Sequence, residues 1–324
     1  MRDVMISSDL KLSIFALVVS LITNLAIGLG APYYLRRVKM ERPAIGIFNP
    51  RDICVLFALL VTIPVFYLHL PRWLLLTFLT ITFVSALSIG FRPLMSPAKL
   101  WLTVGVLIGL NFWMGRNLLG TVLGWQLFWL ETSVIVLLAA ISVTNLYVQG
   151  GMKLKHVALF AIALGVYDVI FTAFWPLTNQ LVQSFLGYPL DPSMGFRLGF
   201  DNAAVGIGDL LVYGLYVNAA LKAYGPKAMR FALGLVVTFG AVLPSLVPLL
   251  IDYVDARTDV LVPAQAWFGP PALLGYLWLR RKYGRERTVK EFWAGPDFLG
   301  RRRPEPAVET VTVPAPVLEA VTTP

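Results

Sequence analysis

The stretch NAAVGIGDLLVYGLYVNAAL, residues 202–221, is apolar enough to lie in a lipid bilayer, yet it carries a carboxylate, Asp209, near its middle. A charged side chain at the centre of a membrane helix costs about 2.5–3.5 kcal/mol on insertion scales, so such residues usually face a polar cavity and serve a function. Asp209 is therefore expected to face a polar cavity inside the membrane.

The composition predicts an integral membrane protein. The 324 residues are 57% hydrophobic and 14% charged, and their mean hydropathy is +0.73. This is more apolar surface than one water-soluble core can bury. The net charge is +9, but the Lys and Arg residues lie between apolar runs and at the C-terminus, so we expect no nucleic-acid partner. The single cysteine, Cys54, excludes an intrachain disulfide and a cysteine-rich metal site.

Nine apolar segments approach the length of about 20 residues that a transmembrane helix needs. They cover residues 12–31, 52–69, 72–90, 98–115, 124–148, 154–176, 200–222, 229–250 and 266–281. Glu131 interrupts the fifth segment near its outer end, where we interpret it as an interfacial group. We predict an all-α polytopic membrane protein with a nine-helix domain over residues 1–283. Residues 284–324 are basic and then rich in Pro, Val and Thr, and we expect a disordered tail there.

The distribution of positive charge predicts the orientation of the chain. Lys and Arg in short connections are retained on the cytoplasmic side of a membrane. The connections after the first, third, fifth and seventh segments, together with the tail, carry 21 of the 27 Lys and Arg residues. We therefore expect the N-terminus outside and the C-terminus in the cytoplasm. The first segment is less consistent with a cleaved signal peptide, because its apolar run is long and its removal would leave the basic loop at 36–51 untethered.

A second acid lies within the sixth segment, in HVALFAIALGVYDVIFTAFWPL (156–177). Asp168 follows Lys155 by 13 residues, and Asp209 precedes Lys222 by 13 residues. At ~1.5 Å per residue, both carboxylates are expected roughly 20 Å from the cytoplasmic edge, on antiparallel neighbours. Two facing acids in a low-dielectric site cannot both ionise cheaply, so they tend to share one proton. One carboxylate can then activate water while its protonated partner donates to a peptide carbonyl; a helix-helix hydrogen bond is the simpler alternative.

Glycines and prolines accompany the two acids. Gly206 and Gly208 each cost a helix roughly 1 kcal/mol relative to Ala, but they allow another backbone to approach closely. Ordinary helix packing is the alternative role for them. In WFGPPALLGYL (267–277), Pro270 and Pro271 withhold two backbone donors, and we expect them to break or start a helix and leave backbone groups free.

Three short motifs occur in order on the sixth, seventh and ninth segments: YD at 167–168, GIGD at 206–209 and PAL at 271–273. In this combination the chain resembles the presenilin and signal-peptide-peptidase family of intramembrane aspartyl proteases. The motifs cover the C-terminal half, whereas the first five segments match by their number alone. The resemblance implies that Asp168 and Asp209 are the catalytic pair and that Tyr167 is the aromatic partner of the first acid.

The resemblance also implies the surroundings of the catalytic pair. Gly206 and Gly208 would shape the cleft, and Pro271, Ala272 and Leu273 would border it and help to hold an unwound substrate. The implied substrates are single transmembrane helices or signal-peptide remnants within the lipid bilayer, and no cofactor or metal is implied. The outside N-terminus matches the signal-peptide-peptidase branch, so a helix with a cytoplasmic N-terminus is the expected substrate.

Two other functions are compatible with paired membrane acids. A proton-coupled transporter or channel would use Asp168 and Asp209 as a proton relay, but no convincing internal repeat is present. Prepilin peptidases also carry a Gly-x-Gly-Asp motif, but they lack the Pro-Ala-Leu element. The only histidines, His69 and His156, lie at predicted membrane edges, which disfavours both a zinc site and a serine protease that needs an intramembrane histidine.

Overall fold

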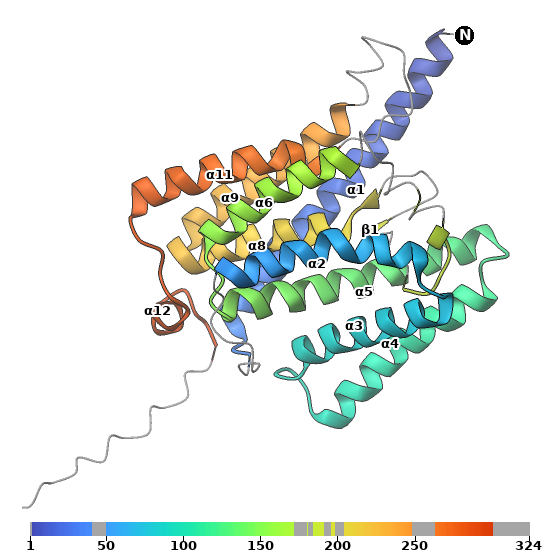
Figure 1. The fold of residues 1–324 in the computed structure, drawn as a ribbon, viewed down its shortest axis with the longest axis horizontal. Coiled ribbons are helices and arrows are strands. Elements are labelled where there is room, and N and C mark those ends of the chain that lie inside the picture. Colours follow the sequence, from blue (N-terminus) through green and yellow to red (C-terminus); the bar gives the residue numbers. More distant parts are fainter. Residues whose placement is uncertain are drawn as a thin grey trace, which may run out of the picture.

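The computed structural model describes residues 2–40, 50–171, 180, 184–190, 196–197, 204–247 and 263–300. The labelled elements are α1 (Arg2–Arg37), α2 (Pro50–His69), α3 (Arg72–Phe91), α4 (Pro97–Asn117), α5 (Val122–Gln149), α6 (Leu154–Val169), β1 (Phe196–Arg197), β2 (Ala204–Val205), α8 (Ile207–Tyr224), α9 (Pro226–Val237), the π-helical turn η2 (Thr238–Val242), α11 (Ala264–Tyr283) and α12 (Val289–Ala294). The described residues are thus almost entirely helical, and the prediction of a helical fold is confirmed (Figure 1). The described residues also contain a short antiparallel pair of strands, β1 and β2.

Several helices have the length and composition of membrane spans. Those that can cross a membrane on these grounds are Ser13–Arg37, Arg72–Phe91, Pro97–Asn117, Val122–Gln149 and Pro226–Val247. The molecule also exposes many large apolar side chains, among them Trp101, Leu102 and Leu274. Because water-soluble monomers rarely expose so much apolar surface, these features indicate an integral membrane protein. Helices also cover at least part of each of the other four predicted spans, whose crossing of the membrane remains a prediction.

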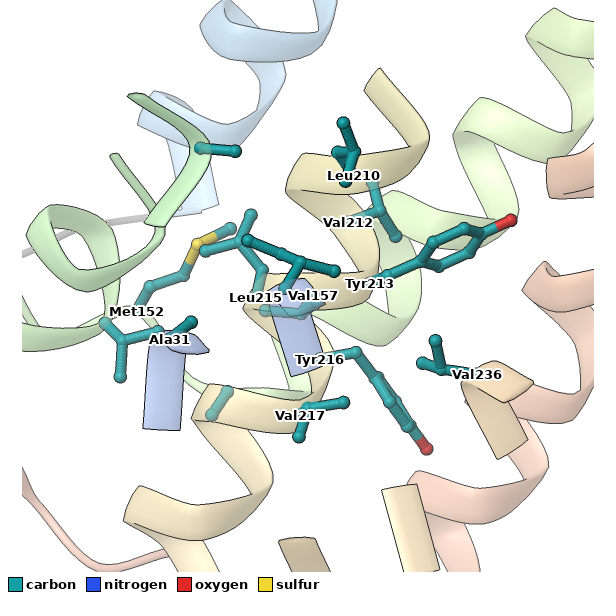
Figure 2. Close-up of a cluster of buried hydrophobic side chains, with 14 of the residues drawn as sticks. Ala31, Met152, Val157, Leu210, Val212, Tyr213, Leu215, Tyr216, Val217 and Val236 are labelled. Carbon is teal, nitrogen blue, oxygen red and sulfur yellow. The ribbon is translucent and has the colours of Figure 1, made fainter. Parts of the chain in front are cut away.

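The most deeply buried helix is α8, which packs against α1, α5, α6, α9 and α11. Every residue from Val212 to Ala223 is buried. In Figure 2, Ala31 and Met152 lie to the left of α8 and Val236 lies to its right. This helix therefore forms the centre of the bundle, and the burial of Val212–Ala223 fixes the position of most of its length.

Polar contacts join the central helices inside this apolar interior. The side-chain amide of Asn218 on α8 donates to the amide oxygen of Asn145 on α5, at 3.1 Å. Asn145 in turn donates to the carbonyl oxygen of Ala31 on α1, at 3.2 Å. Interhelical hydrogen bonds of this kind hold membrane helices together where hydrophobic burial between them is weak. They fix the mutual register of α1, α5 and α8.

The ends of helices that the charge pattern places on one side of the membrane do meet on one side of the bundle. The Tyr34 hydroxyl near the end of α1 donates to the carbonyl of Gly90 near the end of α3, at 2.6 Å. The Met40 backbone N–H, just after α1, donates to the side chain of Gln149 at the end of α5, at 2.9 Å. This arrangement supports the predicted alternation of the helices, while the side on which they end stays a prediction.

Part of the predicted disordered tail is folded. Residues 284–324 were expected to lack structure, yet α12 forms within them and Phe292 and Phe298 are buried. Arg287 donates to carbonyl groups at the C-terminal end of α8. The prediction was wrong for this part because it was based on charge and composition alone. These two phenylalanines pack into the hydrophobic core of the bundle. The residues after 300 lie outside the described residues.

Helices α6 and α11 run antiparallel in close contact, because glycines face the opposing backbone. A Cβ atom added at Gly165 would lie 2.9 Å from the carbonyl oxygen of Gln265, and one added at Gly269 would lie 2.9 Å from that of Ala161. Small residues of this kind let two helix backbones approach in a membrane protein. The contact sets the height of α11 against α6.

We predict that Gly269→Ala lowers the midpoint of thermal unfolding in detergent, because the new methyl group pushes α11 away from the backbone of α6. Gly109→Ala on α4 is the matched control, since no described atom lies within 4 Å of its added Cβ. In an exposed helix interior, alanine is more favourable than glycine by about 1 kcal/mol of helix stability. The control should therefore unfold at the same or a higher temperature. Equal behaviour of the two variants would contradict the close contact of α6 and α11.

Candidate functional site

The two acids lie at the same end of neighbouring antiparallel helices. Asp168 is in the last turn of α6, and Asp209 is in the first turn of α8. The helix of the seventh span was expected from residue 200, but it begins at Ile207 because Ala204 and Val205 pair with β1 and Gly206 is the N-cap. Asp209 therefore lies at a helix start rather than mid-helix, and the equal depth of the two acids in the membrane stays a prediction.

The helix start gives Asp209 a favourable surrounding. Its carboxylate accepts a hydrogen bond from the backbone of Gly206, three residues earlier. A carboxylate at this third helical position satisfies the free N–H group of the N-cap, as in a capping box, and it also meets the positive end of the helix dipole. This answers how an apolar stretch accommodates an acid: the carboxylate replaces water as the acceptor for the first turn of α8.

The two glycines of the motif have different neighbours. A Cβ atom added at Gly206 would lie 3.2 Å from Oδ2 of Asp209, so this glycine leaves room for the carboxylate. Within the described residues, no atom lies within 4 Å of the corresponding position at Gly208. The backbone next to Asp209 is thus uncovered by the described part of the chain on that side.

Gln265, in the first turn of α11, connects the two carboxylates. Its backbone N–H donates to Oδ2 of Asp168 at 3.1 Å, and its side-chain Nε2 donates to Oδ1 of Asp209 at 2.7 Å. Gln265 is 3% exposed, and its Oε1 has no hydrogen-bond partner among the described residues. A single buried residue therefore holds one oxygen of each acid, so the acids share one site.

Tyr213 lies one helical turn after Asp209 and interacts electrostatically with both carboxylates. Its ring is fully buried and meets Phe268 of α11 edge to face, with 5.0 Å between the ring centroids. Figure 2 shows Tyr213 and Tyr216 projecting from α8, and both rings contact Phe268. Tyr213, Tyr216 and Phe268 thus form an aromatic cluster between the acids and the core.

Tyr167 immediately precedes Asp168 and is half-buried. Its ring packs on Phe171, with 4.4 Å between centroids, and it interacts electrostatically with Asp168. Residues 170–171, which begin two residues after the acid, are π-helical. Such turns occur often at functional sites, where they alter the direction of neighbouring side chains.

The Pro-Ala-Leu element was predicted to border the cleft at the two acids, but it lies beyond the first turn of α11, where Gln265 contacts them. Pro270 and Pro271 were expected to break or start a helix, but α11 begins at Ala264 and continues through both. Close packing on α6 and α8 holds this helix together despite the missing N–H groups. Ala272 is buried, and its carbonyl accepts from the Tyr216 hydroxyl at 2.8 Å, while Leu273 is half-buried.

The Pro-Ala-Leu element and Gln265, which binds the two acids, lie at different positions along α11. Pro271 follows Gln265 by six residues, about 9 Å along a helix axis. Pro270 is exposed and Pro271 half-buried. The structure thus brings Asp168, Asp209 and Gly206 together through direct contacts, and it places the Pro-Ala-Leu element on the same helix as their shared ligand, Gln265.

Glu131 has an interhelical partner, and its position at the membrane interface stays a prediction. One of its carboxylate oxygens accepts a hydrogen bond from Asn111 on α4. Asn111 also bonds to Thr132 and to the backbone of Leu190. This polar group joins α4 and α5 and is separate from the paired acids.

Two residues of the site were missed by the sequence analysis. Tyr213 follows Asp209 by four residues, a spacing that places both on one face of a helix and was sufficient to find it. Gln265 carries no such signal, because an amide at a helix start is common and its role depends on where α11 begins.

Comparisons with family models, with curated proteins and with solved structures found no match for this chain. Within the described residues, no group of three or more His, Cys, Asp and Glu side chains is placed to hold a metal ion. The chemistry of the site therefore has to be inferred from two carboxylates, one amide and the surrounding apolar wall.

Proposed function

We propose that the protein is an intramembrane aspartyl protease that cleaves single transmembrane helices. The observation that carries this proposal is the shared binding of Asp168 and Asp209 by Gln265, which brings acids from separate helices into one site. Paired acids in an apolar domain are suited to hold one proton between them. A pair in that state contains both a general base and a general acid.

The proposed reaction is hydrolysis of a peptide bond without a covalent intermediate. The ionised carboxylate takes a proton from water as the water oxygen attacks the carbonyl carbon, and the protonated carboxyl donates to the carbonyl oxygen. The tetrahedral intermediate then collapses, the C–N bond breaks, and the leaving nitrogen receives a proton. The products are a new carboxyl end and a new amino end, and the acids return to sharing one proton.

The surroundings of the acids suit a peptide substrate. Gly208 leaves the backbone beside Asp209 uncovered by described residues, so a substrate backbone can approach there. A helical peptide hides its carbonyl groups in hydrogen bonds to residues four positions later, so it has to unwind locally before attack. We propose that Pro271, Ala272 and Leu273, on the helix that carries Gln265, border the cleft and help to hold the unwound segment.

The charge distribution gives the proposal a direction. With the N-terminus outside, α6 runs outward and α8 runs inward. If the site pairs with the substrate backbone as a strand does, it distinguishes the two chain directions. The proposed substrate is then a helix with its N-terminus in the cytoplasm, such as a signal-peptide remnant or a type II membrane anchor.

Asp168→Asn and Asp209→Asn are each expected to reduce cleavage of a single-span substrate to background, because an amide cannot take part in the exchange of the shared proton. Alanine at either position should have the same effect. Peptide products are measured by mass spectrometry, with thermal unfolding as the control for folding. The assignment of the catalytic pair is falsified if either folded variant retains cleavage near the wild-type rate.

Gln265→Leu is expected to lower kcat by about ten- to a hundredfold, the effect of losing a hydrogen bond to a charged group, with little change in KM. The variant retains the backbone bond to Asp168 and loses the side-chain bond to Asp209. Gln149→Leu is the matched control, since Gln149 is another buried amide whose bonds join Met40 and Val38 to α5. It should lower stability without this selective loss of kcat, and equal kcat values for the two variants would remove the positioning role of Gln265.

Two reporters that carry the same apolar helix in opposite orientations test the direction of the substrate. We expect preferential cleavage of the reporter with a cytoplasmic N-terminus when each is coexpressed with the active protein, and none with the Asp209→Ala form. The readout is the size of the released fragment on each side of the membrane. Preference for the opposite reporter would contradict the proposed orientation while leaving the proposed chemistry intact.

A further inference from the structure

A cavity of about 640 Å³ lies at the opposite end of α8 from Asp209. It is lined by the connection between α5 and α6, the ends of α8 and α11, and the segment that leads into α12. Lys222, on its wall, follows Asp209 by 13 residues, about 20 Å along a helix. The cavity is therefore separate from the paired acids, and its size is within the range of 300–1,000 Å³ that is typical of small-molecule sites.

The wall of this cavity is strongly basic. Among the described residues that line it, the Lys and Arg residues are Lys153, Lys155, Lys222, Arg280, Arg285 and Arg287, and Glu286 is the one acid. Two of these cations already have carboxylate partners, since Arg285 pairs with Glu291 at 2.7 Å and Arg287 with Asp297 at 2.8 Å. The other four form no ion pair with a described residue, although Arg280 donates to the Tyr276 hydroxyl at 3.4 Å and Lys222 to a backbone carbonyl.

That acid is already engaged by the protein backbone. The carboxylate of Glu286 accepts from the N–H groups of Leu154, at 2.8 Å, and Lys155, at 3.1 Å. It thus caps the start of α6, where backbone donors need acceptors. Its charge offsets only one of the four remaining cations, so the cavity keeps a positive potential that favours an anion.

Lys222 is the feature that distinguishes this cavity from an ordinary solvated basic surface. The residue is 2% exposed, and burying an ammonium group is costly unless it is paired. Among the described residues its Nζ donates to one acceptor, the carbonyl of Met152, whereas an ammonium group has three donors. A ligand oxygen in the cavity would satisfy a remaining donor.

The wall contains one further donor. The indole Nε1 of Trp293 is buried and has no hydrogen-bond partner among the described residues, and Trp293 lines the cavity. A phosphate group has several acceptor oxygens and a negative charge, which match an indole N–H, an ammonium and a guanidinium group. A carboxylate offers fewer acceptors, so it matches this set of donors less well.

We propose that this cavity binds a phosphate-bearing anion, either the head group of an anionic lipid or a free phosphate ester, through Lys153, Lys155, Lys222 and Arg280. The predicted location at the cytoplasmic membrane surface gives both kinds of molecule access to it. The site does not depend on the proposed protease activity, because it shares no residue with the paired acids.

The test uses the purified full chain in a neutral detergent and measures binding by native mass spectrometry. One arm titrates phosphatidic acid, with phosphatidylcholine as the zwitterionic control, and the other titrates glycerol phosphate. We expect saturable binding in at least one arm, and the arm that binds identifies the source of the phosphate. Absence of binding in both arms would overturn the proposal.

The triple variant Lys153→Ala, Lys155→Ala and Arg280→Ala removes three exposed cations of the cavity. It should weaken binding at least about tenfold, because each Lys or Arg close to an anionic group contributes to its affinity. The matched control replaces two Lys and one Arg that are exposed outside the cavity: Lys99→Ala, Lys227→Ala and Arg230→Ala. An equal loss in both variants would show diffuse surface attraction and overturn the site. If the triple variant unfolds, Lys153→Ala and Lys155→Ala provide the same comparison singly against Lys99→Ala and Lys227→Ala.

Discussion

The close antiparallel contact between α6 and α11 determines the geometry of the candidate site. Gly165 and Gly269 let the two backbones meet, and this contact places the first turn of α11 beside the last turn of α6. Gln265 consequently reaches Asp168 with its backbone and Asp209 with its side chain. A wider separation of the helices would leave the two acids without a common ligand.

The burial of α8 supplies the second constraint. The neighbouring helices hold α8 along most of its length, so we infer that the core, more than the connecting segments, fixes the position of its first turn. Asp209 at this start satisfies the N-cap and meets the positive end of the helix dipole. A carboxylate there is costly in an apolar domain, yet it is held at a defined position next to a second acid, and this combination is what acid–base chemistry requires.

The opposite end of the same helix has the opposite electrostatic character. Lys222 closes α8 within a basic cavity, and the folded segment after α11 packs across this end through Arg287. The carboxylate at the start of α8 and the ammonium near its end follow the preference of helix termini for negative and positive charge. One buried helix thereby carries both the proposed catalytic site and the proposed phosphate site.

The sequence predicted the helical architecture and the proximity of the two acids, because equal spacing from Lys155 and Lys222 places Asp168 and Asp209 at the same height on antiparallel helices. It did not predict Gln265, whose role depends on α11 starting at Ala264 and on the contact with α6. Predictions from local composition were also wrong for two segments, the start of α11 and residues 284–300. The prolines of α11 are tolerated inside a helix that is packed on two sides, and residues 284–300 fold because Phe292 and Phe298 find apolar partners.

The most direct test of the proposed chemistry is incubation of the purified protein with a panel of single-span substrates in water labelled with heavy oxygen. Mass spectrometry of the products then identifies both the cleaved bond and the origin of the new carboxyl oxygen. The proposal predicts two fragments cut within the apolar segment, with one labelled oxygen in the new carboxyl end. Two results together would contradict proteolysis and indicate a proton relay. The substrates would stay intact throughout the panel, and vesicles that contain the protein would take up protons in a way that requires Asp168 and Asp209.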